Sequence, residues 1–175
     1  NYCLLGIPSA FEMGLNHCRW IYKSGHQLFQ VRSWTTPDNP QVNLDFKVIR
    51  GSVASILVSH HFDEGNAWQI TLTKQSRQHI LKPGPESLIA EKFPCAQFRI
   101  VIQGRDQKVI AGHDELLRPD GMRFRNDLLV FKVKEISAFS MSIVGEVVKP
   151  VTEVLFEDAD QQFSKDCLKA SKAWK

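Results

Sequence analysis

The sequence predicts an all-β protein, an antiparallel β-sandwich of about eight strands that ends in a C-terminal helix. Three observations predict it. Apolar and polar residues alternate over several short stretches, turn residues recur between them, and no long helical stretch separates them. With 175 residues, 43% of them hydrophobic, the chain can bury one core. We expect the sandwich over residues 1–150 and a helical segment over residues 151–175.

The clearest strand signal is the stretch 42–48, which reads Val-Asn-Leu-Asp-Phe-Lys-Val. Its apolar residues share one side and its polar residues the other, because successive side chains of a strand point to opposite faces. We therefore expect a strand with one buried face and one polar face.

Seven more stretches read as strands, some through alternation and others through apolar and β-branched content. They are residues 18–23, 27–34, 53–62, 68–73, 98–102, 127–134 and 139–147. Turn chemistry based on Pro, Gly, Asn and Asp separates them at residues 36–40, 63–66, 82–85, 104–106 and 118–121.

The last segment has a helical period. Between Glu157 and Trp174, apolar residues fall every three or four positions, at 159, 163, 167, 170 and 174. Acidic residues stand at its start and lysines later, which suits the helix dipole. We expect this helix to pack on the sandwich, or to dock on a partner and form a homo-oligomer.

Charge and hydropathy exclude several classes of partner. The chain has 22 basic and 19 acidic residues, mixed along its length, so we predict no nucleic-acid binding. No apolar run approaches the ~20 residues of a membrane span, so we predict no membrane association. The first residue is Asn1 and not Met, which suggests a fragment or a processed product. The cysteines form no paired motif, and we expect reduced thiols in an intracellular protein, in the cytoplasm or nucleus.

Candidate catalytic and metal-binding residues are few. His60 and His61 are adjacent, so on a strand they point to opposite faces and cannot share a metal ion. The run 113–115, His-Asp-Glu, could hold a general base, but the simpler interpretation is a capped turn before two core leucines. We therefore predict no catalytic site, no metal site and no cofactor.

Tryptophans leave a carbohydrate alternative open. Trp20, Trp34 and Trp68 could stack on sugars, as in a carbohydrate-binding module. Their places inside strand patterns favour packing in the core, above all for Trp68.

The segment 95–147 resembles the MATH (TRAF-like) domain, particularly that of speckle-type adaptors with a BTB domain. Three stretches carry the resemblance: 96–102 is similar to the family's "aKFkfsI" strand, 113–117 to "rRDfLL", and 120–133 to "aNGlLpdDkLtLfcEV". Upstream, residues 59–72 are similar to "SstFs…kWcLrv". The resemblance covers about half of the chain. The family's Trp-Gly-Phe segment has no counterpart at residues 106–112.

The resemblance implies a protein-binding module and not an enzyme. A peptide would lie in a shallow groove lined by Phe98, Val109 and His113, and the domain could be a substrate adaptor for a cullin-type ubiquitin ligase. Two alternatives stay open. One is a structural or oligomerising sandwich, for example viral or secreted, and the other is a carbohydrate-binding module.

Overall fold

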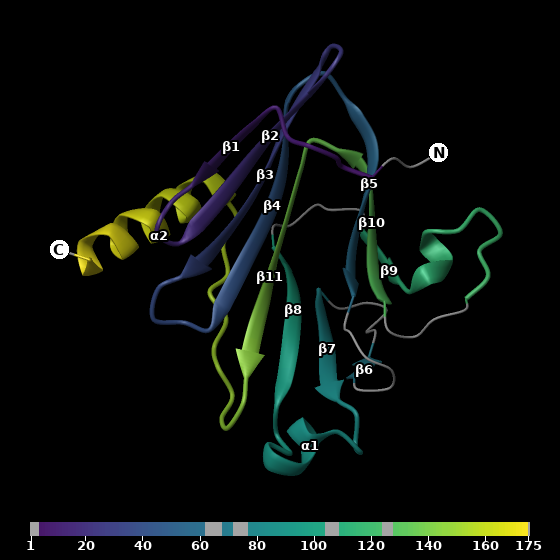
Figure 1. The fold of residues 1–175 in the computed structure, drawn as a ribbon, viewed down its shortest axis with the longest axis vertical. Coiled ribbons are helices and arrows are strands. Elements are labelled where there is room, and N and C mark those ends of the chain that lie inside the picture. The colour runs from purple at the N-terminus through teal and green to yellow at the C-terminus, as the bar shows by residue number, and fades with distance from the viewer. Residues whose placement is uncertain (1–3, 62–67, 72–76, 104–108, 124–127, 175) are drawn as a thin grey trace.

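The computed structural model describes residues 4–61, 68–71, 77–103, 109–123 and 128–174. The turns expected at 63–66 and 104–106 lie outside these residues, and so does Cys3. Two antiparallel sheets of unequal size pack face to face, and a helix follows at the C-terminus (Figure 1). The predicted all-β sandwich with a C-terminal helix is confirmed.

The larger sheet has eight strands in the order β1-β2-β3-β4-β11-β8-β7-β6. Their bounds are β1 Ala10–Met13, β2 His17–Ser24, β3 Gln27–Thr36, β4 Gln41–Arg50, β11 Ala138–Glu146, β8 Gln97–Gln103, β7 Gln78–Pro83 and β6 Trp68–Thr71. Neighbours along this sheet are antiparallel throughout.

The smaller sheet has three strands in the order β5-β10-β9. They are β5 Val53–His61, β10 Leu128–Ile136 and β9 Val109–Gly112. A short helix α1, Leu88–Lys92, joins β7 to β8, and a 3-10 turn η2, Asp114–Leu116, follows β9.

The hydrophobic core lies between the two sheets. Its fully buried members come from both of them: Leu81, Ile100, Phe139 and Met141 from the larger sheet, and Leu129 and Phe131 from the smaller one, all 0% exposed. The pairs on β10 and β11 are alternate residues, as the period of a strand requires.

Two chain crossings hold the sheets together. The chain leaves β4 for β5 through Gly51, whose φ of 86° suits glycine, and leaves β10 for β11 through Ser137. Val48 on the first crossing donates its backbone N–H to the Ser137 carbonyl on the second, at 2.8 Å. Glu135 has a φ of 52° and is left out of the β10–β5 pairings, while the register is the same on either side of it.

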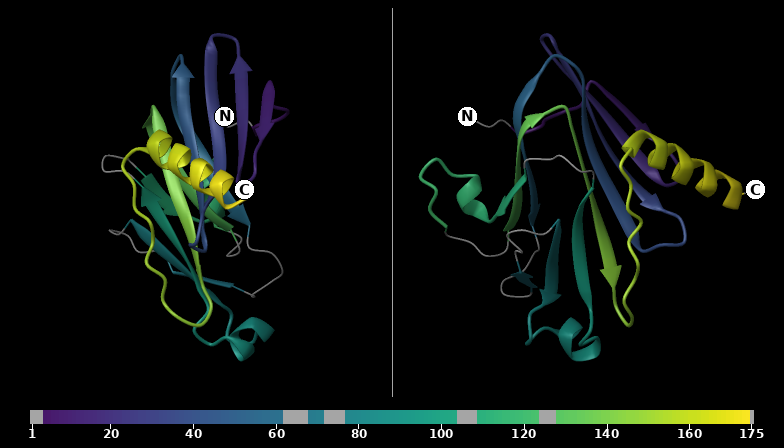
Figure 2. Two further views of the ribbon diagram at one scale, coloured as in Figure 1. Left: turned by 90° about the vertical axis from the view of Figure 1, so that its left-hand side faces the viewer. Right: turned by 180° about the vertical axis from the view of Figure 1, so that it is seen from behind.

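Beyond β11 the chain turns back over the larger sheet. Residues 147–157, which we call the strap, run along the sheet face that points away from the core, and helix α2, Ala159–Ala173, crosses the same face (Figure 2). We call this surface the outer face of the larger sheet. No helix among the described residues is both long and apolar enough to cross a membrane.

Candidate functional site

The outer face of the larger sheet is buried although its side chains are polar. Its members alternate with the core residues: Arg32, Trp34 and Thr36 on β3, Gln41, Asn43 and Asp45 on β4, Gln103 on β8 and Ser142 on β11. Asn43 is 0% exposed and Asp45 is 2% exposed. On the polar side of the 42–48 pattern, Asn43 and Asp45 are therefore covered by protein, and the Lys47 side chain is 44% exposed.

Two glutamines hold the strap by its backbone. The Gln41 side-chain amide donates to the Val154 carbonyl at 2.9 Å, and its oxygen accepts from the Val154 N–H at 2.8 Å. Gln103 donates to the same carbonyl at 3.2 Å and accepts from the Phe156 N–H at 3.1 Å. These amides pair with the strap as a neighbouring strand would.

Helix α2 is held by one buried carboxylate. The Trp34 indole N–H and the Thr36 hydroxyl both donate to Asp166 Oδ2, at 3.0 and 3.1 Å. Trp34 is 1% exposed and its ring meets Phe163 edge-on, at a centroid distance of 5.5 Å. The side chain of Asp158 caps the start of the helix by accepting from two backbone N–H groups.

An ion-pair cluster lies where α2 begins. Arg32 donates to both carboxylate oxygens of Asp45, at 2.7 and 2.8 Å, and also pairs with Asp160 at 2.8 Å. Burial raises the pKa of Asp45, and the hydrogen bonds from Arg32 oppose that rise. The Lys47 hydrogen bond keeps the pKa of Asp160 below its ordinary value, and Lys47 and Arg32 both attract this carboxylate. The cluster thus fastens α2 to β3 and β4.

Two cavities open beside the strap. One of about 320 Å³ lies over Arg32, Asp45 and Lys47 and is closed by the start of α2. The other, of about 480 Å³, lies over β7 and β8 beside Leu155 and Phe156. Gln103 and Glu157 line both, so the two cavities are neighbours; we call the pair the groove, and charged and amide groups are among its lining residues.

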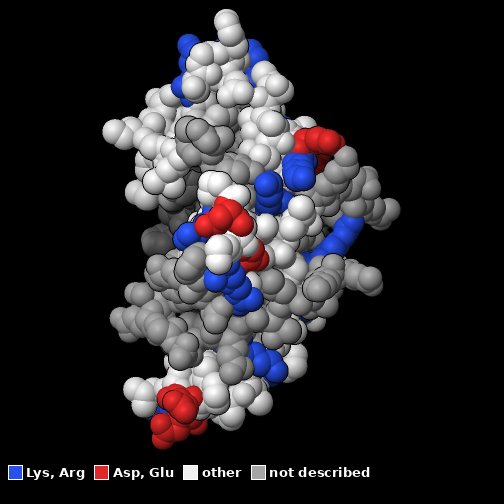
Figure 3. Space-filling view, turned by 90° about the vertical axis from the view of Figure 1, so that its right-hand side faces the viewer, with Lys and Arg blue, Asp and Glu red and all other residues white. Residues whose placement is uncertain are grey.

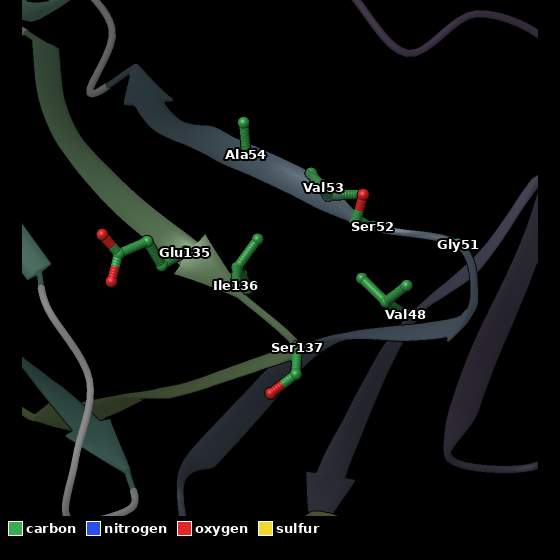
Figure 4. Close-up of a pocket in the computed structure, with 8 residues that line it drawn as sticks. All are labelled: Val48, Gly51, Ser52, Val53, Ala54, Glu135, Ile136 and Ser137. Carbon is green, nitrogen blue, oxygen red and sulfur yellow. The ribbon is translucent and has the colours of Figure 1, made fainter.

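A third cavity, of about 490 Å³, lies at the two chain crossings (Figure 4). Its walls are largely Val48, Val53, Ala54 and Ile136. The Glu135 carboxylate points away from Val48 and Gly51 on the opposite wall, so polar groups do not converge there as a ligand site requires.

One thiol, one imidazole and one carboxylate line up between α2 and the sheet edge. Cys167 Sγ lies 3.3 Å from His17 Nδ1, and His17 Nε2 lies 3.3 Å from Glu12 Oε1. Burial raises the pKa of Cys167, which favours its thiol over the reactive thiolate. The three groups attach α2 to β1 and β2.

The residues expected to line a peptide groove lie in three different places. Phe98 on β8 and Val109 on β9 belong to opposite sheets, and both pack against the core cluster. His113 is 6% exposed, and its Nδ1 lies 2.9 Å from the Leu128 carbonyl. The structure does not gather them on one surface, and whether they bind a peptide stays a prediction.

The other sequence candidates are partly resolved. Trp34 packs against the strap and α2, Trp20 is half-buried, and the Trp68 and His61 side chains lie outside the described residues. Among the residues that the structure describes, no cluster of His, Cys, Asp and Glu could hold a metal ion. On the side that faces right in Figure 1, basic and acidic side chains lie interspersed with neutral ones (Figure 3).

The inner face of the larger sheet is only partly covered. Across the paired residues Phe11, Trp20, Val31, Phe46 and Phe139, exposure falls from 53% at Phe11 to 0% at Phe139. A parallel row begins at Met13, 73% exposed, and ends at Met141, 0% exposed. We call the uncovered part the open flank: Phe11, Met13, Cys18, Trp20, Val31, Ser33, Thr35, Val42 and Leu44.

The fold is a two-sheet β-sandwich with one eight-stranded sheet, whose inner face is partly uncovered and whose outer face is covered by the strap and α2. A family model described as the glycoside phosphorylase supersandwich domain matches residues 1–145, and the chain belongs to this family. A 1,2-β-oligoglucan phosphorylase from Listeria innocua serovar 6a is 27% identical over 100 residues, which are 55% of this chain. The match spans only 9% of that protein's length.

These matches correct four expectations. The MATH resemblance is wrong, because the family that matches most of the chain is a glycoside phosphorylase domain. The ubiquitin-ligase adaptor function falls with it, and so does the peptide-binding module as the main function. The expectation that the chain is not part of an enzyme is also wrong, since the family and the relative are phosphorylases. The carbohydrate alternative agrees better with both matches.

Proposed function

We propose that this chain is the β-sandwich part of a glycoside phosphorylase that cleaves β-linked gluco-oligosaccharides with inorganic phosphate. The family match over residues 1–145 carries the proposal, and the oligoglucan phosphorylase relative supplies the substrate class. The relative's length leaves ample polypeptide for a catalytic domain elsewhere, since this chain spans 9% of it.

We assign the sandwich a supporting role and not the bond cleavage itself. Cleaving a glycosidic bond requires a carboxyl group free to donate a proton to the leaving oxygen. In the smaller cavity, Asp45 and Asp160 are both held by Arg32, and Lys47 also pairs with Asp160. Both oxygens of Asp45 accept hydrogen bonds from Arg32, and the pKa of Asp160 lies below its ordinary value, so neither carboxyl group is free to donate a proton.

The test is phosphorolysis by the complete polypeptide that carries this chain. With β-1,2-linked glucose oligomers, we expect consumption of inorganic phosphate and release of a sugar phosphate. Reactions without phosphate, and reactions with β-1,4-linked oligomers, are the controls. Cleavage that is equally fast without phosphate would replace the proposal with a hydrolase, and no cleavage of any β-glucan would reject it.

The supporting role has its own test in two cavity residues. Asp45→Asn and the exposed Glu157→Gln should leave kcat within about threefold, because neither residue would touch the reacting bond. Glu157→Gln is included because the Glu157 side chain is exposed and lies outside the buried cluster, so this variant should fold even if Asp45→Asn does not. A drop of kcat by 100-fold or more in folded Glu157→Gln would place catalysis in the sandwich.

A second candidate is oligosaccharide binding by the sandwich itself, in the groove beside the strap. Two cavities that share Gln103 and Glu157 favour it, because sugar hydroxyls are bound by carboxylates and amides. Titration of this chain with β-1,2-linked glucose oligomers, followed by the amide signals of the strap, would detect such binding. Absence of any shift at millimolar sugar would remove it.

A further inference from the structure

The two sheets do not match in width. Strands lie about 4.8 Å apart, so a three-stranded sheet covers about 14 Å of a sheet that is eight strands, or about 38 Å, across. The smaller sheet covers the inner face at β11, β8 and β7, where core residues reach 0% exposure. Toward β1 and β2 the same face is left uncovered.

The open flank is uncharged. Its members are apolar apart from Cys18 and the two hydroxyl residues Ser33 and Thr35. The charged residues of β1 and β2 point the other way, where Glu12 pairs with Arg19 and His17 on the α2 side. A sheet face without charge, continuous with a dry core, is the surface that another sheet packs on.

We propose that the open flank is the docking surface for a further β-sheet supplied by the rest of the phosphorylase polypeptide. The inference rests on the proposed function. Val31 and Leu44, at the inner border of the flank, already pack against the core, so a docked sheet would extend that core without a break. In the oligoglucan phosphorylase, the matched region is accompanied by about ten times its own length of other polypeptide, which can supply this sheet.

Other occupants fit the flank less well. An oligosaccharide could stack on Phe11 and Trp20, whose ring centroids lie 5.7 Å apart, but the flank offers no carboxylate or amide side chain to bind its hydroxyls. A second copy of this chain would also meet an uncharged surface. Unlike a sheet from the same polypeptide, it would cover the flank only at a sufficient protein concentration.

Methionine oxidation tests the proposal in the complete polypeptide that carries this chain. The chain has three methionines: Met13 on the flank, 73% exposed, Met122 in the loop after η2, 58% exposed, and Met141 in the core, 0% exposed. With hydrogen peroxide as the probe and mass spectrometry as the readout, we expect Met13 to oxidise at least tenfold more slowly than Met122. Met141 is the control for folding, because it should stay unoxidised as long as the sandwich is folded.

A pair of variants supports the oxidation result. Val42 on the flank is 43% exposed and Ile110 on β9 is 45% exposed, so Val42→Asp and Ile110→Asp place a charge at equally exposed strand positions. Val42→Asp should lower the melting temperature of the complete polypeptide, and Ile110→Asp should leave it within about 2 °C. If hydrogen peroxide oxidises neither Met13 nor Met122, the melting temperatures of these two variants test the proposal instead: an equal effect of both substitutions would reject it.

Each contrary result overturns the proposal. Met13 oxidised as fast as Met122 would show that the flank is bare. Protection of Met13 that disappears on dilution would assign the flank to a second copy, and protection that requires added β-1,2-linked glucose oligomers would assign it to sugar. Methionine oxidation and the melting temperature are both measured without phosphorolysis, so a failure of the docking surface can be distinguished from a failure of the proposed function.

Discussion

Trp34 and Asp166 lie 132 positions apart in sequence, yet the indole N–H of one donates to the carboxylate of the other. The bond matters because both side chains are buried, and a buried donor without an acceptor costs about 1–3 kcal/mol. Asp166 also accepts from Thr36, so a single residue satisfies two donors on β3.

Replacing this carboxylate should therefore be costly. Asp166→Ala leaves the Trp34 N–H and the Thr36 hydroxyl without their acceptor, and we expect a loss of about 2–3 kcal/mol in the free energy of unfolding, measured in urea. Lys165→Ala, at the exposed neighbouring position, should change it by less than about 0.5 kcal/mol. Equal losses in the two variants would contradict the assigned role of Asp166.

A second residue-scale prediction concerns acid. His79 is 4% exposed against the ring of Phe131, and burial lowers its pKa below the ordinary 6.5. Below pH 6.5 the unfolded chain therefore binds a proton more readily than the folded chain. The contribution of His79 to the free energy of unfolding is complete above pH 6.5 and is lost as the pH falls toward the lower pKa of the folded state. His60, whose ring also meets Phe131, has its pKa lowered by burial too and acts in the same direction.

The urea midpoint should therefore fall between pH 7.5 and pH 5.5, and His79→Phe should reduce that fall. His26→Asn, at an exposed turn position, is the control and should keep the dependence of the parent chain. A parent midpoint that is constant over this range would contradict the prediction.

At the scale of elements, the strap is attached by side chains and not by a strand ladder. Gln41→Ala removes the amide that pairs with both backbone groups of Val154, so hydrogen exchange at the Val154 N–H should accelerate about tenfold or more. Gln27→Ala, which removes a hydrogen bond to Ser52 far from the strap, should leave that exchange unchanged. The measurement is hydrogen exchange followed by NMR or mass spectrometry.

Strands and the terminal helix could be predicted from the sequence because alternation and helical spacing are local signals. The stretch 42–48 lies inside β4, and the helix expected from Glu157 begins at Ala159. The short strands β1, β7 and β9 were missed, and the end of β7 was expected to be part of a turn because Pro83 and Gly84 follow each other there.

At the scale of the whole molecule, the chain crossings between sheets set the geometry of the sandwich. A Cβ at Gly51 would lie 3.2 Å from the Gln27 backbone, and the residue has a φ of 86°. Gly51→Ala should therefore destabilise the fold by about 2 kcal/mol or more. Gly25→Ala has a similar positive φ but open space around it, so it should cost about 1 kcal/mol. Thermal unfolding of both variants separates the cost of a positive φ, which both share, from the cost of the contact between the new Cβ and the Gln27 backbone, which only Gly51→Ala has. Equal losses of stability in the two variants would contradict that contact.

The candidate site was harder to predict, for a physical reason. Alternation in β4 distinguishes two faces of a strand, but it does not say what covers the polar one, and Asn43 and Asp45 prove to be buried under the strap and α2. The MATH resemblance failed similarly. Its motif at residues 113–117 is a 3-10 turn after a strand, and such pieces recur in unrelated sandwiches. Pairings such as Arg32 with Asp160 join distant parts of the chain and leave no local pattern.

The way Gln41 and Gln103 hold the strap has an evolutionary consequence. On the strap, the hydrogen bonds of both amides go to main-chain atoms of residues 154 and 156, which every amino acid except proline offers alike. Thr152 and Leu155 point to solvent and add nothing to this attachment beyond the Thr152 carbonyl. Selection can therefore rewrite the outward side chains of this segment freely, and the domain can acquire a new surface there without disturbing how its end is tied down.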